Sequence, residues 1–373
     1  MKNIVTKLFL AAVFVAISTQ VLAAYQEAED IATTDGYAST LEMIRPLAAK
    51  GDAEAQFLLG AMHEKGQGVP RNNKEAMLWY RKSADHGYAK AQNNLGDMYY
   101  NGNGVSQDYS EAMKWYHKAA EQKDAEALYN LGEMYYNGNG VSQDYKEAMA
   151  WYRKAAEQGN VDAQYNLGEM YYHASGVARD YQEAMEWFRK AADLRDAEAQ
   201  YSLGWMYYKG EGRPQDYKEA MIWFRKASEQ NHPEAQVCLG WLFQKGMGVA
   251  QDYQQALFWY RRAEARHSEA QNNLGEMYQN GLGVPQDYKE AVSWFQKAAE
   301  RNNAEAQFRL GSMVELGEGV QQDLVQTHMW FSLAAAAGNT DAIKRIIIAE
   351  TKMTAQQIEK SQEMKKEWLE NHQ

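Results

Sequence analysis

Disulfide chemistry is almost absent from this sequence, because its 373 residues include a single cysteine, Cys238. One thiol cannot form an internal disulfide, so the folded chain has to rely on packing. Cys238 stands directly before the pair Leu239-Gly240. We interpret it as a small residue in the place of a polar one and not as a reactive thiol.

Basic residues are also scarce relative to acidic ones. The chain has 39 lysines and arginines against 50 aspartates and glutamates, a net charge of −11 at pH 7. Loss of the first 23 residues, argued below, removes Lys2 and Lys7 and leaves 37 basic residues, a net charge of −13. Such a surface repels nucleic acids and anionic lipids, so we expect neither as a partner.

Motifs of catalytic chemistry are missing as well. The eight histidines are dispersed, without an HExxH sequence or a pair at i and i+4, so no metal site is expected. The chain has no GxSxG sequence, and most carboxylates fall at expected helix starts or on solvated faces. Even Glu126 and Glu133, which can meet across a groove, are interpreted as surface charges. We therefore expect no cofactor and no enzymatic activity.

Long apolar runs are confined to the start of the chain. The run Leu8 to Ile17 contains no polar residue, follows a positively charged start and precedes the small-residue site Val21-Leu22-Ala23. It is too short to span a membrane, so residues 1–23 are predicted to be a cleaved export signal, with cleavage after Ala24 as the second choice. The absence of a cysteine at this junction argues against a lipoprotein anchor. An uncleaved amphipathic helix is the alternative.

What the sequence does have is a repeat. A Leu-Gly pair recurs at a spacing of 36 residues with one step of 35, at Leu59, Leu95, Leu131, Leu167, Leu203, Leu239, Leu274 and Leu310. A tryptophan follows 20 residues after each of these leucines, at Trp79, Trp115, Trp151, Trp187, Trp223, Trp259, Trp294 and Trp330. Eight units in register predict a solenoid and not a set of unrelated domains.

Each unit is predicted to form two helices. In the third unit one apolar stripe comprises Ala127, Leu131, Met134 and Tyr135, and a second comprises Ala148, Trp151, Tyr152, Ala155 and Ala156. Gly132 lies within the first helix, where it costs about 1 kcal/mol relative to alanine. We therefore expect it to make room for the large tryptophan of the unit, which we assign to the core, or for a neighbouring backbone.

The loop NGNGVSQDY between the two helices resembles neither a phosphate loop nor a calcium site once its context is considered. No strand precedes it, and its glycines stand at a helix end, where left-handed backbone is needed. Its acidic residue is predicted to cap the next helix. The capping-box spacing recurs at Asp108/Glu111, Asp144/Glu147, Asp180/Glu183, Asp216/Glu219 and Asp287/Glu290, with an amide version at Asp252/Gln255 and Asp323/Gln326.

These residues carry a family resemblance. The pattern AEAxxxLGxMYxxGxGVxxDYxEAxxWYRKAAEQGN closely resembles the Sel1-like repeat, a relative of the tetratricopeptide repeat, over residues 52–338. The resemblance implies an all-α protein, a right-handed α-solenoid of eight helix-turn-helix repeats that acts as a scaffold for protein partners, and it implies no catalysis. The chain differs from the cysteine-rich branch of this family in Helicobacter, because its repeats lack cysteine pairs.

The expected organisation has four parts. Residues 1–23 are the signal, residues 24–51 an amino-terminal capping helix region, and residues 339–373 a pair of carboxy-terminal capping helices with Ile343, Ile346 and Ile347 on one face of the first. A membrane-surface helix is the alternative for this last segment. The repeats between them are predicted as 52–87, 88–123, 124–159, 160–195, 196–231, 232–266, 267–302 and 303–338.

The first helix of each unit keeps a face that the core stripe does not use. By resemblance this face lines the concave side, where stacked repeats turn equivalent residues into columns of amides, acids and tyrosines suited to an extended segment or helix of a partner. Trp205 and Trp241 replace the acid in adjacent units. We predict them to be the main contact, or alternatively to complete the core. The candidate partner-binding residues are Asn130, Glu133, Tyr136, Asn166, Glu169, Tyr172, Trp205, Tyr208 and Trp241.

The preferred function is therefore an exported, monomeric, non-enzymatic scaffold for protein–protein interaction, periplasmic or secreted, without stable membrane insertion. The chain resembles the Sel1-repeat host-entry proteins of Legionella, which suggests a virulence factor for host-cell entry, and a periplasmic regulator or assembly factor of envelope proteins is the alternative. Its partner is then a host or an envelope protein. A cell-wall hydrolase or weak β-lactamase is the outside alternative.

Overall fold

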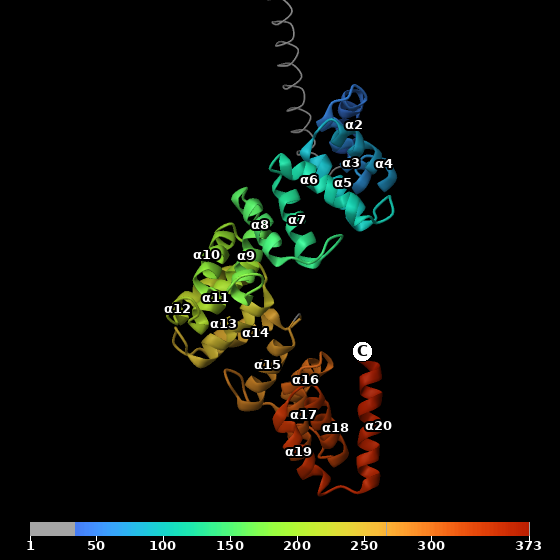
Figure 1. Ribbon diagram of the computed structural model, residues 1–373. Helices are drawn as coiled ribbons and strands as arrows, with labels where there is room; N and C mark the ends of the chain where they lie inside the picture. Colours follow the sequence, from blue (N-terminus) through green and yellow to red (C-terminus); the bar gives the residue numbers. More distant parts are fainter. Residues whose placement is uncertain (1–33, 266, 373) are drawn as a thin grey trace, which may run out of the picture. The chain divides into compact units, whose positions relative to one another are not determined.

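The computed structural model describes residues 34–265 and 267–372, and every regular element in them is an α-helix. The predicted export signal, residues 1–23, lies outside the described residues, as does the beginning of the predicted amino-terminal cap. None of the described helices is both long enough and apolar enough to cross a membrane. The expected all-α class of helical repeats is confirmed (Figure 1).

Each repeat contributes two helices of similar length. The first helices are α3 (Ala53–Lys65), α5 (Ala89–Asn101), α7 (Ala125–Asn137), α9 (Val161–His173), α11 (Ala197–Lys209), α13 (Pro233–Lys245), α15 (Ser268–Asn280) and α17 (Ala304–Leu316). The second helices are α4 (Asn73–Asp85), α6 (Tyr109–Glu121), α8 (Tyr145–Glu157), α10 (Tyr181–Asp193), α12 (Tyr217–Glu229), α14 (Tyr253–Ala263), α16 (Tyr288–Glu300) and α18 (Leu324–Ala336). α2 (Thr34–Ala49) precedes them, and α19 (Thr340–Glu350) and α20 (Ala355–Asn371) follow.

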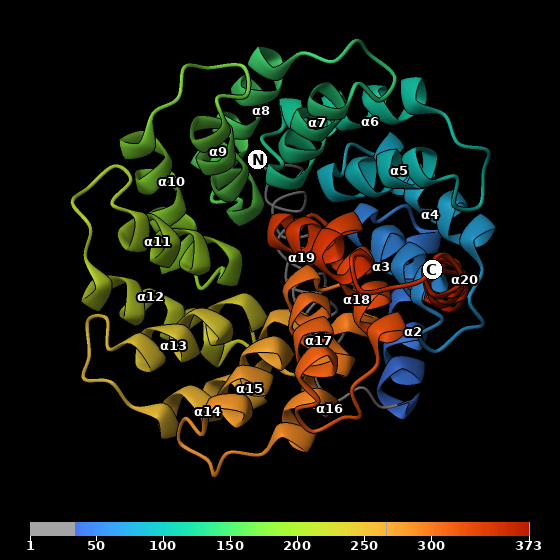
Figure 2. The same ribbon diagram turned by 90° about the horizontal axis from the view of Figure 1, so that it is seen from below.

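The chain divides into two compact units, residues up to Ala191 and residues from Ala192 onward. Within each unit helices that follow one another in sequence pack together, as α7 does against α8 and α8 against α9. In Figure 2 the second unit shows α11, α13, α15 and α17 in one row and α12, α14 and α16 in another. We call the surface of the first helices that is turned away from the second helices the first-helix face.

The helix ends follow the predicted local chemistry. Asp144 accepts hydrogen bonds from the backbone N–H groups of Lys146 and Glu147, which confirms it as the N-cap of α8. Gly138 and Gly140 have φ angles of 74° and 75°, the left-handed backbone that glycine adopts without strain. In α20 both halves of a capping box are present, between Thr354 and Gln357. The capping residues and glycines of these loops therefore end one helix and start the next.

The core places a different aromatic residue at its centre than the sequence indicated. A Cβ atom at Gly132 would lie 2.5 Å from Cδ1 of Tyr152, whose side chain is fully buried, so the glycine makes room for this tyrosine. Trp151, which we assigned to the core, lies at the edge of it: the side chain is half-buried and packs against the cluster around Tyr116, with Lys154 Nζ 3.8 Å from its ring centroid. The same contact recurs as Gly60–Tyr80, Gly96–Tyr116, Gly168–Phe188, Gly204–Phe224, Gly240–Tyr260, Gly275–Phe295 and Gly311–Phe331.

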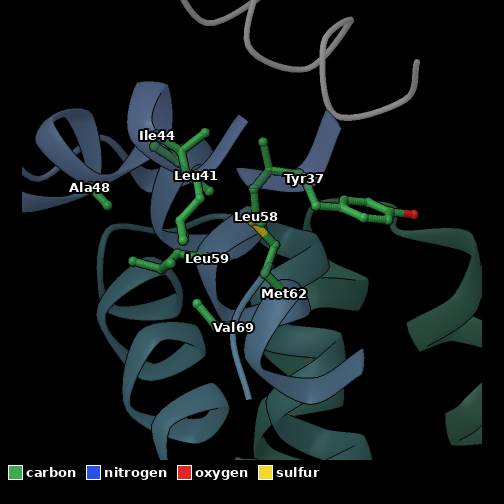
Figure 3. Close-up of a cluster of buried hydrophobic side chains, with 9 residues drawn as sticks. Tyr37, Leu41, Ile44, Ala48, Leu58, Leu59, Met62 and Val69 are labelled. Atoms are coloured by element: carbon green, nitrogen blue, oxygen red, sulfur yellow. The ribbon is translucent and has the colours of Figure 1, made fainter. Parts of the chain in front are cut away.

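Both terminal segments cover the repeats next to them. α2 buries Leu41, Ile44 and Ala48 against Leu58 and Leu59 of α3 (Figure 3). At the other end α19 and α20 each pack against α18.

The inward face that we expected on α19 is wrong in part. Ile346 packs against the cluster around Phe331, whereas Ile343 and Ile347 are 52% and 60% exposed. In this 11-residue helix, which packs mainly against α18, the buried stripe is narrower than the run of isoleucines.

Candidate functional site

In the first unit the amide and acid columns of the first-helix face bond to each other. Asn130 Nδ2 donates to Asn93 Oδ1 at 3.0 Å and to Asp97 Oδ1 at 3.2 Å, so it reaches back to the preceding repeat. Asn166 Nδ2 donates in the same way to Glu133 Oε1 at 3.1 Å. These half-buried amides therefore tie neighbouring first helices together.

The acids of these columns also accept hydrogen bonds from the core tyrosines. The Tyr116 hydroxyl donates to Asp97 Oδ1 at 2.7 Å, and the Tyr152 hydroxyl donates to Glu133 Oε1 at 2.5 Å. Burial, ahead of the nearby carboxylates, raises the pKa of Asp97 to about 6. Much of the polar surface that we predicted to hold a partner is thus engaged in joining repeats.

The remaining candidates of the first unit make local contacts. The Tyr136 ring lies edge-on to Tyr145 with centroids 5.0 Å apart, and Tyr172 makes similar contacts with His173 and Tyr181. His173 Nε2 lies 3.4 Å from Glu169 Oε2. Tyr136, Glu169 and Tyr172 are half-buried residues of the first helices α7 and α9.

The second unit contains a cavity between its first helices. Trp205 and Tyr208 of α11 and Trp241 of α13 line a cavity of about 240 Å³, which we call the tryptophan cavity. All three are half-buried, and the rings of Tyr208 and Trp241 meet edge-on with centroids 5.6 Å apart. The two indoles therefore neither complete the buried core nor stand free in solvent. The other lining residues, which the sequence analysis missed, are Tyr201, Lys209, Phe224, Glu234, Val237, Leu242, His267 and Glu269, together with Cys238.

One of these residues had a detectable signal. Tyr201 stands four positions before Trp205 on α11, and their rings stack with centroids 6.4 Å apart. Residues at i and i+4 share a helix face, so Tyr201 could have been predicted to lie beside Trp205 at the contact surface. Glu234 and Glu269 come from first-turn positions that resemble ordinary helix-start acids, and only the packing of three successive repeats brings them to the cavity.

The hydrogen bonds around the two tryptophans are rearranged to match. Trp205 replaces an acid in a repeat whose second helix carries Phe224, which has no hydroxyl to donate. Trp241 replaces an acid opposite Tyr260, and there the Tyr260 hydroxyl donates to Gln244 Oε1 at 2.7 Å. Gln244 occupies the position of the column tyrosines. Gln244 therefore accepts the hydrogen bond of the Tyr260 hydroxyl in place of the missing acid.

Cys238 lies in the wall of the tryptophan cavity. Burial raises the pKa of its thiol to about 12, so the reactive thiolate is scarce at neutral pH. The interpretation of Cys238 as a small, unreactive residue fits this environment.

Two groups of polar residues have the residue types of a catalytic or metal site. His328 Nδ1 lies 2.8 Å from Ser361 Oγ and its Nε2 lies 3.3 Å from Glu350 Oε1, the order of a hydrolase triad. Ser361 is 1% exposed and His328 3% exposed, so a substrate cannot reach the hydroxyl. The contact instead fastens α20 to α18 and α19.

The second group surrounds His232, which is 6% exposed and stacks on Tyr201 with centroids 4.7 Å apart. Its ring nitrogens each lie 3.2 Å from a carboxylate oxygen, those of Glu198 and Glu234. Among the described residues no cluster of three or more histidine, cysteine, aspartate or glutamate side chains has the arrangement of a metal site.

Comparison with known families decides the identity of the fold. The family model described as Sel1 repeat matches residues 53–88, 89–124, 125–160, 161–196, 197–232, 233–266, 268–303 and 304–339. The chain belongs to the Sel1 repeat family. Sel1 repeat proteins generally serve as scaffolds for protein–protein interactions and are typically not enzymes.

Solved Sel1 repeat structures resemble the chain over most of its length. A Sel1 repeat protein from Oxalobacter formigenes is 35% identical, with 82% of this chain and 88% of that chain covered and a TM-score of 0.63. A protective antigen of uropathogenic Escherichia coli with an SLR fold is 30% identical, with 94% and 95% covered and a TM-score of 0.48. Comparison with curated proteins gives no match.

Proposed function

We propose that this Sel1 repeat protein is an exported, non-enzymatic scaffold that binds a segment of a protein partner on its first-helix face, with Trp205 and Trp241 as the main contact. The observation that carries the proposal is the placement of both half-exposed indoles around one cavity within the second unit. Tryptophan is enriched among residues that dominate binding energy, and such residues cluster in pockets. The acid and amide columns of the first unit serve chiefly to stack the repeats.

The non-enzymatic part of the proposal rests on accessibility. The serine and histidine of the grouping described above are buried where α20 packs on α18, and the Cys238 thiol has its pKa raised to about 12. The tryptophan cavity is lined by carboxylates and aromatic rings but has no activated nucleophile. A groove that binds without reacting is the simplest function of this arrangement.

The test uses the intact chain and a double variant, Trp205→Ala/Trp241→Ala. The purified proteins are used to capture partners from envelope and host-cell lysates, and each captured protein is then titrated against both. We expect the double variant to keep its melting temperature within a few degrees, because neither indole belongs to the buried core, and to bind its partner at least tenfold more weakly.

The matched control is Phe258→Ala, which removes a 52% exposed aromatic ring from α14 outside the cavity. It should bind as the unchanged chain does. A double variant that melts early and binds normally when folded would overturn the assignment of the indoles to binding.

Export is proposed from residues 1–23 alone. Cell fractionation compares the unchanged chain with a version that lacks these residues, and we expect only the former outside the inner membrane. Equal cytoplasmic retention of both would overturn this part of the proposal.

A further inference from the structure

The size of the tryptophan cavity limits what it can hold. Small-molecule sites typically measure about 300–1,000 Å³, and this cavity is smaller, at about 240 Å³. Most of its lining residues belong to the first helices α11 and α13. A single long side chain that projects from a bound segment fits such a hollow better than a free metabolite does.

Its aromatic walls favour a positive charge. The face of an aromatic ring is the negative end of its quadrupole, so a lysine or arginine cation is attracted to it within about 6 Å. The chain already shows this attraction at the rim, where Lys209 Nζ lies 4.8 Å from the Trp205 ring centroid and 5.6 Å from that of Tyr208. Tyr201 and Trp241 add further rings to the same cavity.

The two carboxylates of the lining favour the same sign of ligand. Glu234 and Glu269 both line the cavity. Glu234 already lies 3.2 Å from His232 Nδ1 and 3.8 Å from His267 Nε2. Glu269, in contrast, is exposed and makes no hydrogen bond or ion pair within residues 34–265 and 267–372. It is therefore free to pair with a cation that enters.

We propose that the tryptophan cavity binds a lysine or arginine side chain carried by an extended or helical segment of the partner protein. The cation lies against Trp205 and Trp241, and Glu269 pairs with it. The proposal rests on the proposed function, because it names the chemistry of the same surface. The net charge of −11 supports it further, since an acidic chain attracts a basic segment over a distance.

The test starts from a random peptide library displayed on phage and selected on the intact chain. We expect selected peptides to contain a lysine or arginine whose replacement by the neutral isostere, norleucine or citrulline, weakens binding about tenfold. Glu269→Gln should weaken binding of the basic peptide roughly fivefold. Lys209→Met should strengthen it, because the competing cation at the Trp205 ring is removed.

Glu269→Gln is expected to weaken binding and Lys209→Met to strengthen it, and these opposite effects make the test decisive. The matched control is Asp162→Asn. Asp162 is an exposed acid at the same position of α9 as Glu269 is of α15, so its removal should leave binding unchanged. If Trp205→Ala/Trp241→Ala abolishes binding but basic and neutral peptides bind equally, the inference fails and the proposed function stands. If the double variant binds every selected peptide normally, both fail.

Discussion

The hydroxyl of Tyr116 donates a hydrogen bond to Asp97 Oδ1 at 2.7 Å, and this contact links the two helices of the second repeat beneath its surface. Asn130 of the next repeat donates to the same oxygen at 3.2 Å. One carboxylate thus joins both helices of its own repeat and the first helix of the following one. Because it is largely buried, its ionisation affects the stability of the fold.

Stability should therefore depend on the protonation of Asp97. Its pKa is about 6 in the folded chain and about 3.9 in an unfolded one. Between these pH values the folded state keeps a proton that the unfolded state has released, so the free energy of unfolding falls as pH rises from about 4 to 6. The loss is on the order of 3 kcal/mol.

Urea denaturation at a series of pH values measures this effect. Asp97→Asn should remove this part of the pH dependence, because the amide Oδ1 still accepts from Tyr116 and the side chain no longer ionises. The control Asp162→Asn removes an exposed acid and should keep the dependence. An unchanged pH dependence in Asp97→Asn would show that other groups cause it.

Replacement of Gly132 should be costly although it lies in a helix. Alanine gains about 1 kcal/mol of helix propensity, but its Cβ atom would lie 2.5 Å from two ring atoms of Tyr152, whose side chain is 0% exposed. Overpacking of this kind costs about 1–3 kcal/mol. We expect Gly132→Ala to lower the melting temperature by several degrees.

A second background separates packing from propensity. In a chain that carries Tyr152→Leu the ring is gone, so adding Gly132→Ala there should be neutral or stabilising. An equal loss of melting temperature in both backgrounds would contradict the assignment of Tyr152 as the reason for the glycine.

The period of the repeat was sufficient to predict the helices, but not which aromatic residue is central. Trp151 and Tyr152 are adjacent, and both fall near the edge of one apolar stripe, so spacing does not separate them. The notch at Gly132 does, because the Tyr152 ring fills it and Trp151 remains half-buried beside Lys154. Which aromatic residue is central therefore depends on the facing helix, and the apolar pattern of a single helix carries no information about it.

The candidate site was predictable to a similar extent. Trp205 and Trp241 stood out because they replace an acid in a regular column, and the structure puts both at one cavity. The role of the acids in joining repeats was not predictable. Asn166 bonds to Glu133, 33 positions before it, and this separation differs from the 36-residue period of the repeat. Contacts between repeats follow the stacking offset, and a single sequence does not specify it.

Cys238 should react slowly with thiol reagents while the chain is folded. Burial raises its pKa to about 12, so at pH 8 the thiolate is far rarer than in an unfolded chain, where the pKa is about 8.5. We expect labelling by a small disulfide reagent to be at least 100-fold faster in denaturant than in buffer. Cys238→Ser provides the blank, and fast labelling of the native chain would place the thiol in solvent.

The same pKa shift has a consequence at high pH. Above about pH 8.5 the unfolded chain loses the thiol proton, whereas the folded chain keeps it until about pH 12. The free energy of unfolding should therefore fall as pH rises through this range. Cys238→Ala should lessen the fall, as measured by the urea midpoint at pH 8 and pH 10.

The contact between His328 and Ser361 should hold the last helix in place. Both side chains are buried, and His328 Nδ1 lies 2.8 Å from the Ser361 oxygen. Ser361→Ala leaves that nitrogen without a partner, at a cost of about 1–3 kcal/mol. Because α20 packs on α18 through this contact, the loss should appear as faster amide hydrogen exchange in α20 at an unchanged rate in α7.

The exposed Ser110 in α6 offers the control, because Ser110→Ala removes a hydroxyl from the surface and should leave exchange in α20 unchanged. Hydrolase activity discriminates the structural role from a catalytic one. If Ser361 only fastens the helix, the native chain and both variants should all fail to turn over a cell-wall or β-lactam substrate. Turnover by the native chain that Ser361→Ala abolishes would make the grouping catalytic and would require α20 to open, which its amide exchange rate would then reveal.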